Sequence, residues 1–67
     1  METNSRKLIH LLEADGWALI RVTGSHHILT KPGNSHRAVV PHPKRDLGPG
    51  LVLQIYRIAG WPKDCRA

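Results

Sequence analysis

The chain has 67 residues, 40% of them hydrophobic and 22% charged, a composition typical of one small folded domain rather than of a disordered segment. No apolar run approaches the roughly 20 residues that span a bilayer, and the first residues show no secretion leader, so we expect a cytoplasmic protein without a membrane partner. The one cysteine, Cys65, excludes an internal disulfide, and its place beside the C-terminus favours an incidental over a catalytic thiol.

The charge balance is strongly basic. Ten Lys and Arg residues stand against five Asp and Glu, which gives a formal net charge of +5. Such an excess favours a polyanionic partner, either nucleic acid or an acidic protein, although a cationic surface without a partner remains an alternative. The few aromatic residues, 4% of the chain, argue against a single-strand binder that stacks bases on several exposed rings.

The chain begins with a predicted helix over residues 5–15. Apolar side chains recur there at helical spacing, with basic and acidic ones between them. Asn4 or Ser5 can cap its start, and Gly16 suits the left-handed position just past its end.

Three strands are predicted next, over residues 17–23, 26–31 and 37–40, because strand formers dominate these segments. Gly24-Ser25 forms a tight turn between the first two strands, and residues 32–35 (Pro-Gly-Asn-Ser) form the second turn. Two short connections in succession predict an antiparallel meander.

A basic, proline-containing loop over residues 41–46 ends the third strand. Apolar residues then recur at helical spacing from residue 51 to residue 59, with Pro49 in the first turn and Gly60 as the C-cap. We therefore predict an α+β domain of αβββα order, with a three-stranded antiparallel sheet and both helices on one face. The domain takes in residues 1–67, with a core over about 5–61 and an irregular tail at 62–67. The alternation along residues 37–40 does not show which face of the sheet the helices cover.

The five histidines do not predict a metal site. His26 and His27 are neighbours in a strand and point to opposite faces, so they cannot bind one ion together. His10, His36 and His42 form no pair at helical spacing, and no cysteine cluster joins them. We therefore expect neither a metal nor a cofactor.

His26 is the strongest catalytic candidate. It follows the turn Gly24-Ser25 at the open end of a hairpin, and a neutral imidazole can accept a proton at pH 7. The alternative is that His26 and His27 are half-buried strand residues, which residue type and spacing alone favour. These patterns by themselves indicate no more than a small basic domain directed at nucleic acid.

Four sequence blocks together resemble the HicA toxin family, in its order and spacing. They are residues 5–17 (SRKLIHLLEADGW), 24–27 (GSHH), 40–47 (VPHPKRDL) and 58–60 (IAG). The likeness runs from about Ser5 to Trp61, and the combination is specific although each block alone is weak. The chain departs from the family at Leu51, where members usually have Thr, and at Leu29, where they often have an aromatic residue.

The resemblance implies a toxin of double-stranded-RNA-binding-like fold that cleaves messenger RNA and is neutralised by a cognate HicB antitoxin. The family's catalytic histidine directly follows Gly-Ser and maps onto His26, with Gly24 and Ser25 as the supporting turn. The implied reaction uses the RNA's own 2′-OH as nucleophile, with His26 as general base and cationic groups on the phosphate, and needs no metal. The candidates for RNA binding are Lys31, Arg37, His42, Lys44 and Arg45, each of which could instead be a solvated surface charge.

Several assignments stay open at this point. Arg21 could pair with Asp15, with Asp46 or with phosphate, and the proton for the leaving 5′-oxygen could come from water, His42 or Lys44. Two other functions are possible: a double-stranded-RNA-binding module without catalysis, and a degenerate toxin that persists as the partner of an acidic antitoxin.

Overall fold

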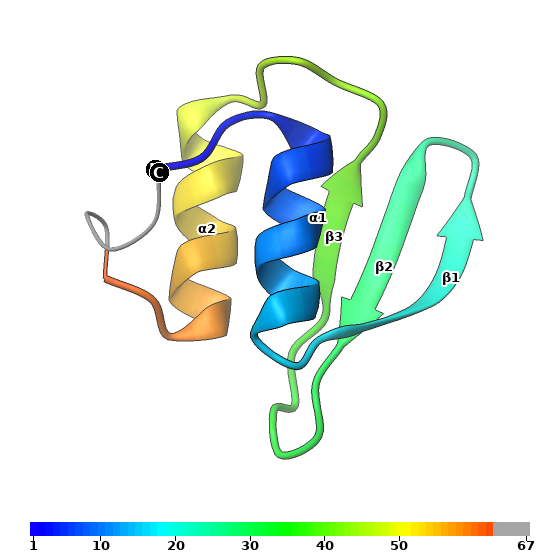
Figure 1. Ribbon diagram of the computed structural model, residues 1–67, viewed down its shortest axis with the longest axis vertical. Coiled ribbons are helices and arrows are strands. Elements are labelled where there is room, and N and C mark those ends of the chain that lie inside the picture. Colours follow the sequence, from blue (N-terminus) through cyan, green and yellow to red (C-terminus); the bar gives the residue numbers. More distant parts are fainter. Residues whose placement is uncertain (63–67) are drawn as a thin grey trace.

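The computed structural model describes residues 1–62, so Cys65 and nearly all of the predicted tail lie outside the described residues. The elements are α1 (Ser5–Ala14), β1 (Ala18–Thr23), β2 (His26–Thr30), β3 (Ala38–Pro41) and α2 (Pro49–Ala59). The strands form one antiparallel sheet in the order β1-β2-β3, which confirms the predicted αβββα fold (Figure 1).

Local sequence signals determine where both helices begin and end. The side chain of Asn4 accepts the backbone N–H of Lys7 at 3.2 Å, so Asn4 is the N-cap of α1. Gly16 follows α1 with a φ of 102°, a conformation that disfavours any residue with a Cβ. Pro49 is the first residue of α2, and Gly60 ends it in the left-handed conformation. Neither helix in residues 1–62 has the length and apolar character required to cross a bilayer.

Four of the strand boundaries differ from the prediction by one residue. Trp17 precedes β1, and its side chain is buried in the core. Lys31 opens a turn instead of ending β2, because its carbonyl accepts the backbone N–H of Asn34 at 3.0 Å and Gly33 supplies a positive φ. At β3 the strand runs from Ala38 to Pro41, and Pro41 is tolerated since β3 is an edge strand.

Both helices pack on one face of the sheet. Leu29, Ala38 and Val40 point toward the helices and are fully buried, whereas Val39 points to the opposite, open face and is 38% exposed. In Figure 1, α1 and α2 stand side by side next to β3, and β1 is the strand farthest from α2. The core comprises Leu8, Ile9, Leu12, Trp17, Leu29, Ala38, Val40, Leu47, Val52, Ile55, Tyr56 and Trp61.

The two departures from the family pattern both lie at packed positions. Leu29 is fully buried in the core. Leu51 lies in the first turn of α2 and packs against the core, and the N-cap Gly48 makes no side-chain hydrogen bond to that helix. At position 51 the chain therefore makes apolar contact with the core.

Candidate functional site

The turn between β1 and β2 places His26 at the start of β2. Gly24 has a φ of 60° and Ser25 does not have a positive φ, the pattern of a type II′ hairpin turn. His26 pairs with Thr23 on one side and with Pro41 on the other. Its side chain is exposed on the open face of the sheet, where a large polyanion can reach it.

His27 lies on the other face, beneath α1. Its ring meets the ring of His42 edge to face, with centroids 4.9 Å apart, and both line a pocket of about 190 Å³. The Nδ1 atom of His27 is buried and has no hydrogen-bond partner among residues 1–62. Also within these residues, no three His, Cys, Asp or Glu side chains are arranged to hold one metal ion. The two neighbouring histidines therefore differ in accessibility, and only His26 faces solvent on the open face.

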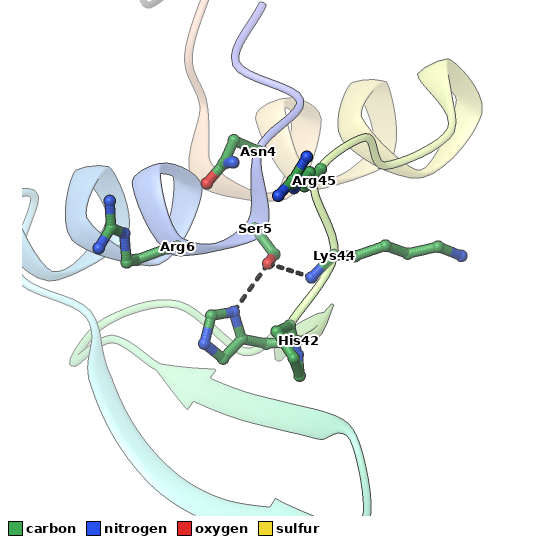
Figure 2. Close-up of a pocket in the computed structure, with 7 residues that line it drawn as sticks. Asn4, Ser5, Arg6, His42, Lys44 and Arg45 are labelled. Carbon is green, nitrogen blue, oxygen red and sulfur yellow. Dashed lines mark hydrogen bonds between the residues drawn. The ribbon is translucent and has the colours of Figure 1, made fainter.

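Ser5 anchors the basic loop to α1. Its hydroxyl accepts the backbone N–H of Lys44 at 2.8 Å and lies 2.7 Å from Nδ1 of His42 (Figure 2). Its backbone N–H donates to the carbonyl of Lys44 at 2.9 Å, and the side chain is almost fully buried. The sequence had suggested only a capping role for Ser5. A long-range anchor of this kind leaves no local sequence signal.

A basic pocket of about 290 Å³ lies where this loop meets the N-terminus of α1 (Figure 2). Arg6, His42, Lys44 and Arg45 line it, and the side chains of Arg6 and Lys44 extend from it in opposite directions. The first turn of α1 carries no acidic residue, so the partial positive charge of the helix N-terminus adds to the field there. This pocket is suited to an anion such as phosphate, and it brings together three of the predicted RNA-binding residues.

Lys31 lies elsewhere, at the opposite end of β2 from His26. Its ammonium group forms an ion pair with Asp15 at 3.2 Å, and the same carboxylate oxygen accepts Nε1–H of Trp61 at 3.1 Å. Burial raises the pKa of Asp15, but the hydrogen bonds from Trp61 and Lys31 outweigh it and hold the pKa below its ordinary value of 3.8. Asp15, the C-cap of α1, thus connects the end of the sheet at Lys31 with Trp61, which follows the C-cap of α2.

Arg37 and Arg21 lie on the open face together with His26. Arg37 directly precedes β3, and Arg21 pairs with Ile28 of β2. Both line a shallow cleft of about 210 Å³ with Ile20 and Ile28. The sequence had left the partner of Arg21 open, because strand periodicity alone does not reveal how β1 pairs with β2. The predicted residues therefore occupy three places: the open face, the basic pocket and the Asp15 contact.

Comparison with known proteins identifies the family. The family model described as HicA toxin of bacterial toxin-antitoxin matches residues 5–61. A search of curated proteins finds no match to the chain. The family match begins at the first residue of α1 and ends just after the C-cap of α2, so it includes every helix and strand described above. The chain therefore belongs to the HicA toxin family, the toxin component of a bacterial toxin–antitoxin pair, and has a cognate antitoxin as its partner.

Proposed function

We propose that this toxin is an endoribonuclease that cleaves messenger RNA in the cytoplasm, with His26 as general base and without a metal or cofactor. The observation that supports this best is the position of His26, exposed on the open face directly after the Gly24-Ser25 turn. The alternative for this histidine, a half-buried strand residue, describes His27 instead. Family membership supports the toxin role to which the cleavage activity would belong.

The proposed reaction is an internal displacement at phosphorus. Neutral His26 removes the proton from a ribose 2′-OH, and that oxygen attacks the adjacent phosphorus. A 2′-O–P bond forms and the P–O5′ bond breaks, which leaves a 2′,3′-cyclic phosphate on one fragment and a 5′-OH on the other. The proton on His26 returns to solvent, and the leaving 5′-oxygen takes its proton from water. His42 is a poorer donor for this step because Ser5 holds its ring beside His27 on the helix-covered side.

Cationic side chains would hold the RNA on either side of this centre. Lys44 and Arg45 lie on the loop that begins next to His26, since the backbone N–H of His42 donates to the carbonyl of Ser25 at 2.6 Å. They would bind phosphates flanking the cleaved one and stabilise the charge that develops on it. Arg37 would do so from the open face. Lys31 has the least support as an RNA contact, because its ammonium group is already paired with Asp15.

The antitoxin partner would be a HicB-like protein that covers His26 and the Lys44-Arg45 loop together. A net charge of +5 on so small a domain makes an acidic surface on that partner electrostatically favourable. RNA and antitoxin would then compete for the same positive groups.

Cleavage of a defined RNA by the purified protein tests the proposal. The His26→Ala variant is expected to lose cleavage while its circular dichroism spectrum stays that of the wild type. EDTA is expected to leave the rate unchanged, and a 2′-deoxy sugar at the cut position is expected to block cleavage. Normal cleavage by His26→Ala, or activity lost in EDTA and restored by zinc or magnesium, would overturn this mechanism.

Binding of structured RNA without cleavage is a second candidate function. The basic pocket at the N-terminus of α1 favours it, because three cationic residues, Arg6, Lys44 and Arg45, line that pocket and His26 does not. Induction in a bacterial host separates the two functions. Growth arrest that disappears with His26→Ala supports cleavage, whereas RNA binding that is equal in both proteins, with no growth arrest, supports the binding module.

A further inference from the structure

The pairing between β1 and β2 contains an irregularity that changes the direction of one arginine. Leu19 pairs with the buried Leu29, so regular alternation from Leu19 would turn Arg21 toward the helices. The register shifts between Leu19 and Arg21, and Arg21 pairs with Ile28 instead. Because paired residues share a face, the bulge brings Arg21 onto the open face with His26. Bulges commonly redirect a side chain in this way beside functional sites.

We propose that Arg21 and Arg37 form a nucleotide subsite on the open face, which binds the RNA strand next to the phosphodiester that His26 attacks. This inference rests on the function proposed above and adds to it the path of the substrate. The two arginines line the cleft of about 210 Å³ together with Ile20 and Ile28.

The chemistry of the cleft suits a nucleotide. A guanidinium group binds phosphate oxygens through two parallel N–H donors and can also stack on a base. Within residues 1–62, neither Arg21 nor Arg37 forms an ion pair, so both charges are available to a ligand. Ile20 is 56% exposed on this surface, an apolar contact that a ribose or base can cover. An anion with an apolar body therefore fits the cleft better than a free inorganic ion.

The strand register shows in which order His26, Arg21 and Arg37 follow one another along the sheet. Arg21 lies beside Ile28, two residues from His26 along β2, which is about 7 Å of strand. Arg37 lies beyond the pair of Leu29 with Ala38, at least about 10 Å along β2 from His26. We place the cleaved phosphodiester at His26, the next phosphate at Arg21 and a more distant one at Arg37.

RNA binding by single-arginine variants tests this placement. Arg21→Ala and Arg37→Ala are made in the His26→Ala protein so that the RNA stays intact, and affinity for an eight-nucleotide RNA is measured across a salt series. Each change is expected to weaken binding about tenfold and to reduce the slope of log K against log salt by about 0.7, the loss of one phosphate contact. Arg57→Ala is the matched control, because it removes the same charge from an exposed position on α2, outside the cleft. Arg57→Ala is expected to change the RNA affinity and the salt slope much less than Arg21→Ala or Arg37→Ala does.

Cleavage of RNAs of different length tests the order. With His26 intact, Arg21→Ala is expected to slow cleavage of a trinucleotide, the shortest RNA with a phosphate next to the cleaved one, and of the longer RNA. Arg37→Ala is expected to slow only the longer RNA at low concentration. If Arg21→Ala and Arg37→Ala bind and cleave like Arg57→Ala while His26→Ala is inactive, the subsite is wrong and the proposed function stands. If the wild-type protein does not cleave RNA at all, the proposed function fails, and the salt series still shows whether the cleft binds RNA. If circular dichroism shows that an Ala variant is unfolded, the salt series is repeated with Arg21→Gln and Arg37→Gln. An unchanged RNA affinity in these Gln variants would overturn the subsite.

Discussion

Ser5 and Lys44 are 39 positions apart in the chain and are joined by two hydrogen bonds. The Ser5 backbone N–H donates to the Lys44 carbonyl at 2.9 Å, and the Lys44 backbone N–H donates to the Ser5 hydroxyl at 2.8 Å. The same hydroxyl lies 2.7 Å from Nδ1 of His42, so it is hydrogen-bonded to the ring as well as to the backbone of Lys44. One buried side chain thus holds the basic loop in position against α1.

Replacing this hydroxyl is expected to destabilise the domain. Ser5→Ala leaves the Lys44 N–H and His42 Nδ1 without their partner, which is expected to lower the free energy of unfolding by about 1–3 kcal/mol. Urea denaturation followed by circular dichroism measures this. Ser35→Ala is the control, since Ser35 is exposed between β2 and β3 and its loss is expected to change stability by less than about 0.5 kcal/mol. Equal midpoints for the two variants would show that the Ser5 contacts contribute nothing measurable.

The two neighbouring histidines are expected to respond oppositely to substitution. His27→Ala removes the edge-to-face contact with His42 and is expected to cost about 1 kcal/mol of stability while most cleavage is retained. His26→Ala removes an exposed side chain and is expected to leave the urea midpoint near that of the wild type while cleavage is lost. Initial cleavage rates and urea midpoints of both variants provide the test. An active His26→Ala protein beside an inactive, stable His27→Ala protein would reverse the assignment.

Removal of both loop cations is expected to weaken RNA binding without unfolding the domain. Lys44→Ala with Arg45→Ala takes two exposed charges from the basic pocket, so the salt slope for single-stranded RNA is expected to fall by up to about 1.4. The measurement uses the His26→Ala protein with and without the loop changes. Antitoxin binding is expected to weaken in parallel, because both ligands would use these groups. If the RNA affinity and the salt slope do not change, the loop is not part of the RNA site. Arg37 and Lys31 would then be the remaining candidates for RNA contact.

The Asp15 contact is expected to make stability depend on pH in the acid range. The pKa of Asp15 in the folded chain lies below 3.8, so its stabilising effect is complete above that value and is lost as the pH falls through the lower folded pKa. Asp15→Asn is expected to be less stable than the wild type at pH 7, with the difference shrinking below about pH 4. Glu13→Gln, an exposed carboxylate on the same helix, is the control and is expected to show no such convergence. Parallel pH profiles for wild type and Asp15→Asn would contradict the assignment.

Much of the fold could be predicted because its signals are local. Asn4 ahead of an amphipathic segment, Gly16 after it and Gly60 after the second one each act within a few residues through backbone conformation and caps. The turn at Gly24 likewise needs only a positive φ, which glycine adopts readily. For the same reason, the placement of His26 directly after a hairpin turn was visible before any tertiary structure was known.

The order of the elements, their turns and caps, and the position of His26 at the start of a strand all follow from local patterns, because they depend on residues close together in the chain. Three features became known only from the folded chain: the face of the sheet that the helices cover, the position of Arg21 on the open face with His26, and the contact of Ser5 with the loop at Lys44. The physical reason is that strand register and loop docking arise from pairing between distant segments. A shift of one residue reverses which side chains face the core, and no local pattern specifies that shift.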